Sequence, residues 1–121
     1  MIDRTDELLG TLDPWIQLRA WNLIYAARRS GIPMHIISAR RSYEANRDAG
    51  GATKSYHLTG DAFDVAVVGY QRDEIPFQWW QQVGQWAEQN LQLFWGGHFS
   101  GAPDVNHFDA RTYRQFYPQN L

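Results

Sequence analysis

The chain contains no cysteine among its 121 residues. Disulfide bonds and thiolate metal sites are therefore excluded. Lysine is nearly absent as well, because ten of the eleven basic residues are arginines. The arginine side chain presents a planar fork of donors that matches a carboxylate, so this bias favours recognition of acidic groups.

Long apolar runs are also missing. No stretch approaches the roughly 18 apolar residues that a membrane-spanning helix needs. Residues 1–7 do not combine a charged segment with a following apolar segment, as a secretory signal does. We therefore expect a protein made in the cytoplasm without a cleaved signal and without stable membrane insertion. The net charge of −2 gives no signature of nucleic-acid binding.

The length predicts a single domain over residues 1–121, and we expect it to act as a monomer. The apolar fraction of 44% is that of an ordinary globular protein. Six Trp, six Tyr and six Phe are many for this length. They predict a core or a substrate groove that is rich in aromatic side chains.

The spacing of apolar residues predicts two long helices. The first begins at Asp13-Pro14, where the aspartate is an N-cap and the proline takes the first helical position, and it ends near Ser30. The second runs from Pro76 to about Asn90. Each helix should carry a buried stripe, formed by Ile16, Ala20, Leu23, Ile24 and Ala27 on the first and by Phe77, Trp80, Val83, Trp86 and Ala87 on the second.

Short apolar runs rich in β-branched residues predict four strands. They cover residues 34–38, 62–68, 91–95 and about 105–108. Ser42 should cap a short helix that ends near Asp48, whereas residues 8–12 form only a lead-in. Helices that cluster before and between the strands favour an α+β fold, with helices packed on a small antiparallel sheet.

His57 and Asp64 lie on either side of Gly60. Imidazole and carboxylate are good ligands of zinc, whose catalytic sites typically use three protein ligands at about 2.0–2.2 Å. In an extended chain these two residues would lie roughly 23 Å apart, so the chain must reverse between them. Thr59-Gly60-Asp61 can provide this reversal, because glycine tolerates turn dihedrals that are closed to other residues.

The remaining parts of a zinc site must come from other segments. The candidates for a third ligand are His35, His98 and His107. His107 fits best, because Asp104 places a carboxylate three residues before it. Such a carboxylate can accept a proton from the attacking water in a zinc hydrolase. An arginine is also needed to stabilise the oxyanion, and Arg40 and Arg41 are the candidates.

Two spaced motifs belong to this set of residues. The first is Ser-x-His-x-x-Gly-x-Ala-x-Asp at residues 55–64, and the second is Asp-x-x-His-Phe at residues 104–108. Together with Arg41-Ser42 and Trp95-Gly96-Gly97, they resemble the zinc D-alanyl-D-alanine peptidase family. Its members include VanX- and VanY-type peptidases and bacteriophage L-alanyl-D-glutamate endopeptidases. The resemblance extends over about residues 36–108, most of the chain.

The resemblance implies a role for each matched residue. The ligands of a Zn²⁺ ion would be His57, Asp64 and His107. Asp104 would be the catalytic acid and base, Arg41 would stabilise the transition state, and Ser55 would lie near the substrate. The implied fold is the small α+β domain of D-Ala-D-Ala peptidases and Hedgehog-type signalling domains.

The sequence departs from the family pattern at two positions. His98 follows the Trp-Gly-Gly step where endopeptidase members often carry an acidic residue, and we treat it as a candidate substrate contact. Asp104 stands where the carboxypeptidase and dipeptidase branches usually have glutamate. This second departure favours the endopeptidase branch.

We therefore expect a zinc metallopeptidase that cleaves peptidoglycan stem peptides between L-alanine and D-glutamate, as an endolysin does. Such a lysin would act on the bacterial cell wall after synthesis in the cytoplasm. Two alternatives stay open, namely a D-alanyl-D-alanine carboxypeptidase or dipeptidase and a non-catalytic metal-bearing binding module on the same fold. Non-haem iron oxygenases use a similar ligand set, so the expectation of zinc depends on the hydrolytic base.

Overall fold

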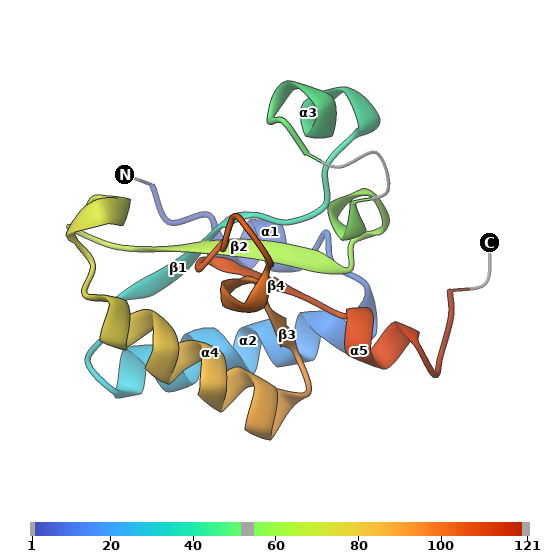
Figure 1. Cartoon of the computed structure of the whole chain (residues 1–121). Helices are drawn as coiled ribbons and strands as arrows, with labels where there is room; N and C mark the ends of the chain where they lie inside the picture. The colour runs from blue at the N-terminus through green and yellow to red at the C-terminus, as the bar shows by residue number, and fades with distance from the viewer. Residues whose placement is uncertain (1, 52–54, 120–121) are drawn as a thin grey trace.

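The computed structural model describes residues 2–51 and 55–119 (Figure 1). The helices are α1 (Thr5–Leu9), α2 (Pro14–Arg29), α3 (Tyr43–Asp48), α4 (Phe77–Leu91) and α5 (Arg111–Arg114). The strands are β1 (Met34–Ser38), β2 (Ala62–Val67), β3 (Phe94–Trp95) and β4 (His107–Asp109). Three short 3-10 helices lie between them, η1 (Tyr56–Thr59), η2 (Arg72–Glu74) and η3 (Gly96–His98).

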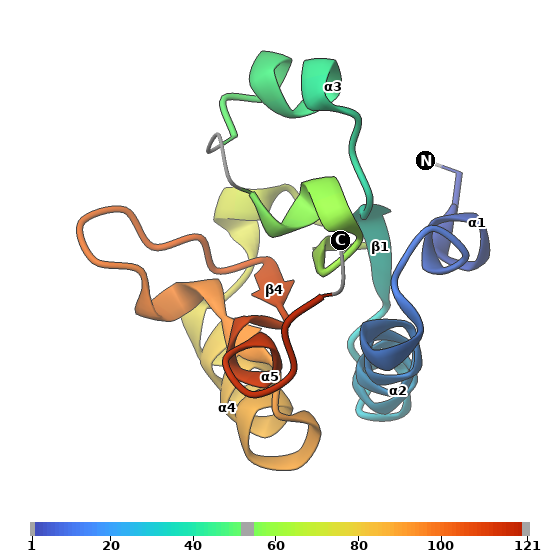
Figure 2. The same cartoon turned by 90° about the vertical axis from the view of Figure 1, so that its right-hand side faces the viewer.

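The four strands form one antiparallel sheet in the order β1-β2-β4-β3. Helices α2 and α4 lie against one side of the sheet, whereas α3 and η1 lie on the other side (Figures 1 and 2). The α+β fold with an antiparallel sheet, expected from the sequence, is therefore confirmed. Within the described residues, no helix is long and apolar enough to cross a membrane.

Alternation along β2 gives the sheet two chemically different faces. Phe63 and Val65 are buried in the core, and the ring of Phe63 stacks on Phe108 of β4 with centroids 5.5 Å apart. Asp64 lies between them in sequence and points to the opposite face. Because Asp64 pairs with His107 in the register between β2 and β4, both side chains emerge on that opposite face.

Helix α2 follows the sequence prediction closely. The Asp13 carboxylate accepts a hydrogen bond from the backbone N–H of Trp15 at 3.2 Å, and Pro14 occupies the first helical position. The helix ends before Ser30, and its predicted stripe of five apolar residues is fully buried. The helix therefore supplies one wall of the core beneath the sheet.

Three predicted elements differ from the structure. Residues 8–12 were expected as a lead-in, but α1 begins earlier and packs Leu8 and Leu9 into the core. Helix α4 continues to Leu91, so only Phe94 and Trp95 remain for the third strand. The fourth strand covers His107–Asp109, which is shifted towards the C-terminus from the expected 105–108.

The buried stripe of α4 is also narrower than expected. Trp80, Val83 and Ala87 are buried as predicted. Phe77 and Trp86 are instead 54% and 38% exposed, so their inclusion in the stripe was wrong. Helical spacing shows which residues of α4 share a face, but how much of that face is buried depends on how the partner helix α2 packs against it.

Candidate metal centre

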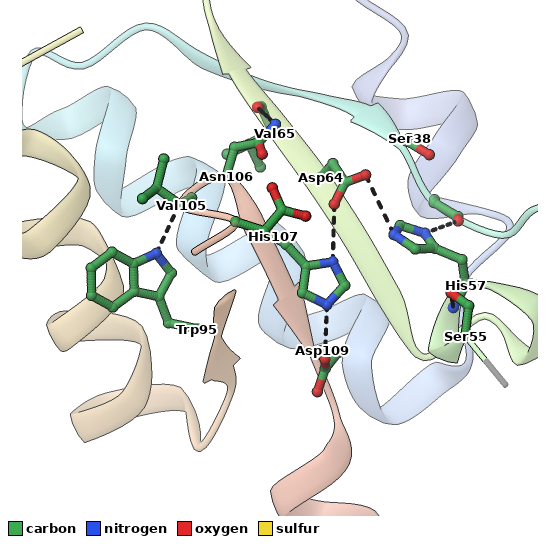
Figure 3. Close-up of polar contacts among 12 residues, drawn as sticks. Ser38, Ser55, His57, Asp64, Val65, Trp95, Val105, Asn106, His107 and Asp109 are labelled. Atoms are coloured by element: carbon green, nitrogen blue, oxygen red, sulfur yellow. Dashed lines mark hydrogen bonds and ion pairs between the residues drawn. The ribbon is translucent and has the colours of Figure 1, made fainter. Parts of the chain in front are cut away.

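Asp64 lies between two imidazole rings on the face of the sheet opposite the core (Figure 3). Its Oδ1 lies 3.1 Å from Nδ1 of His107, and its Oδ2 lies 3.3 Å from Nε2 of His57. One ligand atom from each of the three residues lies within 4.8 Å of the other two, and all three residues are buried. The structure thus brings together the three residues predicted to hold a metal.

His57 is oriented by the backbone around it. It belongs to η1, whose first turn is capped by the Ser55 hydroxyl, which accepts a hydrogen bond from the His57 N–H at 3.1 Å. The Nδ1 atom of His57 lies 2.6 Å from the carbonyl oxygen of Ala39. Because a carbonyl only accepts hydrogen bonds, Nδ1 donates to it, and Nε2 is the nitrogen left to face Asp64.

The chain reversal between His57 and Asp64 occurs at Gly60. This residue ends η1 in the left-handed conformation, with φ of 76°. A side-chain Cβ at this position would lie 2.6 Å from Nη2 of Arg40 and 3.0 Å from the carbonyl oxygen of Thr11. Dihedral angle and packing therefore both require glycine, and the reversal expected from the sequence lies at this residue.

His107 is held from its other side by Asp109, a contact that the sequence analysis missed. Nε2 of His107 lies 2.8 Å from Oδ2 of Asp109, which is fully buried and also accepts hydrogen bonds from Arg111. Burial opposes the charged imidazole, but the hydrogen bonds to Asp109 and Asp64 outweigh it and raise the pKa of His107 to about 9.

The same contacts keep Asp64 ionised. Burial acts to raise the pKa of this carboxyl, but the hydrogen bonds to His107 and His57 outweigh it and hold the pKa well below its usual range. Two imidazole nitrogens and one carboxylate therefore converge in a buried cluster, and a proton on His107 balances the negative charge. This donor set fits a divalent cation that replaces that proton, and it matches the ligand chemistry of zinc.

Arg41 reaches this cluster, whereas Arg40 does not. Nη2 of Arg41 donates to Asp64 at 2.8 Å, and its Nε donates to the hydroxyl of Ser38 at 2.9 Å. Arg40 donates instead to the backbone carbonyl of Thr11 and does not line the cavity at the cluster. Of the two arginines considered from the sequence, Arg41 is the one beside the cluster.

Asp104 is placed near the cluster by a loop that closes on Gly96. The backbone N–H of Asp104 donates to the Gly96 carbonyl at 2.9 Å, and a Cβ on Gly96 would lie 2.3 Å from the Asp104 carbonyl oxygen. The carboxylate of Asp104 is partly exposed and accepts a hydrogen bond from Nη2 of Arg72 at 3.0 Å. The Trp-Gly-Gly step therefore allows the close approach that positions this loop.

A cavity of about 580 Å³ joins these groups on the surface. Its polar lining consists of Arg41, Ser55, His57, Asp64, Arg72, Asp104, Asn106, His107 and Arg111. Phe99, Tyr56 and the small residues 49–51 complete the wall. The cavity thus has the size of a small-ligand site, with the buried cluster in its lining.

The other two histidines lie elsewhere. Nε2 of His98 lies 2.7 Å from the Glu88 carboxylate of α4, and His98 does not line the cavity, so its role in substrate binding stays a prediction. His35 is buried on β1, and its two ring nitrogens have no hydrogen-bond partner within the part of the chain that the structure describes. Neither residue belongs to the group formed by His57, Asp64 and His107.

Comparisons with known proteins place this geometry in context. A family model described as Peptidase M15 matches residues 2–86, which include Arg41, His57 and Asp64 but end before Asp104 and His107. A search of curated proteins finds no match.

Several solved structures share the fold. The Serratia marcescens L-Ala D-Glu endopeptidase ChiX is 24% identical, with a TM-score of 0.60 over 91% of this chain and 90% of that chain. The LD-carboxypeptidase LdcB is 19% identical, with a TM-score of 0.59 over 92% and 77%. A mutant of the vancomycin resistance D,D-pentapeptidase VanY in complex with Zn(II) is 17% identical, with a TM-score of 0.55 over 91% and 80%.

Proposed function

The chain belongs to the Peptidase M15 family, and from that premise we propose that it is a zinc peptidase that cleaves peptidoglycan stem peptides between L-alanine and D-glutamate. One observation carries the proposal. The buried group of His57, Asp64 and His107 shares a cavity with the partly exposed carboxylate of Asp104 and with Arg41. These are the parts that metal-assisted hydrolysis of an amide requires.

The three cluster residues would hold the metal, and each is prepared for this by its neighbours. Nε2 of His57 and Nδ1 of His107 face Asp64 because the other nitrogen of each ring is bonded elsewhere. When bound there, zinc supplies a Lewis acid that polarises the peptide carbonyl and lowers the pKa of water towards about 7.

Asp104 supplies the proton chemistry in the proposed reaction. Its carboxylate accepts a proton from the attacking water and later transfers it to the leaving amine. The side chain is partly exposed at the cavity rather than buried with the ligands, so it can reach both the water and a bound peptide. Its loop is fixed through Gly96, which limits the motion of the carboxylate.

Arg41 supplies positive charge where the carbonyl oxygen becomes negative. Its guanidinium is already anchored on Asp64 and Ser38, so it requires little reorganisation during the reaction. The same contact with Asp64 makes Arg41 part of the support of the metal ligand. We therefore assign it both functions.

The choice of peptide bond depends on the chemistry of the base and on the family resemblance. Aspartate at position 104 favours the endopeptidase branch over the carboxypeptidase branch, where glutamate is usual. ChiX, which shares the fold, is described as an L-Ala D-Glu endopeptidase. The substrate would then be the cell wall, and the enzyme would act there after release from the cell.

Product analysis tests this proposal. Purified sacculi are digested with the zinc-loaded protein, and the soluble products are identified by mass spectrometry. New carboxyl-terminal L-alanine and amino-terminal D-glutamate support the proposed bond, whereas released D-alanine would indicate a D,D-carboxypeptidase. The absence of any product from folded, zinc-loaded protein would favour a metal-bearing binding module. The presence of Asp104 and Arg41 in the cavity lining argues against that alternative.

A further inference from the structure

Three arginines line the cavity, and two of them are already committed to buried carboxylates. Arg41 is bonded to Asp64. Arg111 binds Asp109 through Nε and Nη2, and its guanidinium lies over the ring of Phe94 at 4.2 Å. Arg111 therefore holds the site together, and Arg41 is already assigned to the carbonyl oxygen of the scissile peptide bond.

Arg72 differs from these two arginines. Its side chain is 61% exposed, and within the described residues its single hydrogen bond goes from Nη2 to the Asp104 carboxylate. A guanidinium has five N–H donors, so most of its donors are available. Arg72 comes from η2, between β2 and α4, whereas Asp104 comes from the loop before β4, so the pair joins two segments at the cavity.

We propose that Arg72 binds a carboxylate of the substrate, namely the one on the α-carbon of the leaving amine. This inference rests on the proposed function, in which Asp104 transfers a proton to that amine. A group bonded to Asp104 is therefore within reach of substituents on the neighbouring α-carbon. In a stem peptide D-glutamate is linked through its γ-carboxyl, so this α-carbon carries a free carboxylate.

The charges of the cavity agree with an anionic ligand. Three arginines and two carboxylates line it, and a bound divalent cation adds further positive charge. Arginine recognises a carboxylate through two parallel hydrogen bonds, which an amide cannot match. We therefore expect the enzyme to prefer D-glutamate with a free α-carboxylate over its α-amide by about tenfold in kcat/KM, a modest factor because the site is solvent-exposed.

The test uses two synthetic stem peptides that differ only in this carboxylate or carboxamide. Wild type, Arg72→Gln and Arg47→Gln are compared, all zinc-loaded. Arg47 is a matched control because it is 67% exposed, pairs only with its neighbour Asp48 among the described residues, and does not line the cavity. Equal denaturation midpoints establish that the variants are folded.

Arg72→Gln should raise KM for the acidic peptide about tenfold and leave KM for the amidated peptide unchanged. The preference for the acidic peptide would then disappear. Arg47→Gln should keep the full preference for the acidic peptide, and Arg72→Lys should keep part of that preference. The inference is overturned if wild type cleaves both peptides equally well. It is also overturned if Arg72→Gln lowers kcat by the same factor on both peptides, which would mean that Arg72 acts only through Asp104. If wild type cleaves neither peptide, the proposed function itself fails.

Discussion

Nε2 of His107 lies 2.8 Å from the carboxylate of Asp109, which is completely buried and is held in turn by Arg111. Arg111, Asp109 and His107 are thus linked in series, from Arg111 at the cavity wall to Nδ1 of His107, which faces Asp64. This chain sets the orientation of the imidazole, because with Nε2 bonded to Asp109 only Nδ1 is left to face the other ligands.

Replacing Asp109 should therefore weaken metal binding without touching a ligand. We expect Asp109→Asn to lower zinc affinity by roughly 10–100-fold, the usual effect of losing such a supporting carboxylate. Competition with a chromophoric chelator measures the affinity. Asp48→Asn, which removes an exposed carboxylate outside the cavity lining, should bind zinc as wild type does. An unchanged affinity in Asp109→Asn would show that the ring is oriented by other contacts.

The stability of the metal-free protein should depend on pH through His107. Its pKa is about 9 in the folded chain, because the hydrogen bonds to Asp109 and Asp64 outweigh burial, and about 6.5 when unfolded. The folded state thus binds the extra proton, and the stabilisation is fully present below pH ~6.5 and lost as the pH rises through about 9.

Urea denaturation of metal-stripped protein between pH 6 and 9.5 checks this dependence. We expect the free energy of unfolding to fall by an amount on the order of 2–3 kcal/mol. The His107→Gln variant should show little of this decline, because it lacks the group that titrates. A flat profile for the metal-free wild type would mean that His107 is neutral in the folded state.

Asp104 should be needed for turnover but not for metal binding. We expect Asp104→Asn to lower kcat by roughly 10²–10⁴-fold, the range for loss of a general base. Because the Asp104 carboxylate makes no hydrogen bond with the side chains of His57, Asp64 and His107 in the part of the chain that the structure describes, the zinc affinity of the variant should equal that of wild type. A parallel loss of zinc would identify Asp104 as a ligand rather than a base.

The neighbouring arginines provide an internal comparison. Arg41→Lys keeps the charge but loses the fork that joins Asp64 and Ser38, and we expect roughly a 10²-fold loss of kcat/KM. Arg40→Lys should stay close to wild type in activity, because Arg40 lies outside the cavity lining. Steady-state assays on one stem peptide compare kcat/KM of the two variants. A larger loss in Arg40→Lys than in Arg41→Lys would contradict the assignment of Arg41.

Features with a local chemical signal could be predicted from the sequence. Asp13-Pro14 begins α2, and Ser42 caps α3 by accepting from the backbone N–H of Ala45 at 3.0 Å. The proximity of His57 and Asp64 could also be predicted, because zinc chemistry and the turn glycine both require the chain to reverse.

The features that escaped prediction depend on exact boundaries or on contacts distant in sequence. Asp109 shares a face with His107 only because β4 extends to residue 109, and a strand that ends at 108 hides this relation. Arg72 of η2 and Asp104 of the loop before β4 are 32 residues apart, and no periodicity signals such a contact. Helix α1 has five residues, too few for a helical pattern to be recognised.

Gly60 offers a test of how the turn supports the site, with Gly31 as a matched control. Both residues have a positive φ, of 76° and 87°, but a Cβ at Gly31 would meet no atom within 4 Å. Gly31→Ala should therefore cost about 1 kcal/mol for the left-handed backbone alone. Gly60→Ala must also displace Arg40 and crowd the Thr11 carbonyl, and we expect a loss of about 2–3 kcal/mol.

Urea denaturation of the metal-free variants measures both costs, and zinc titration follows on the same samples. Because Gly60 closes the turn that carries His57, its replacement should also weaken zinc binding, whereas Gly31→Ala should not. Equal destabilisation of the two variants would show that Arg40 moves away at no cost. In that case, the turn would depend on the glycine dihedral alone and not on its packing against Arg40 and Thr11.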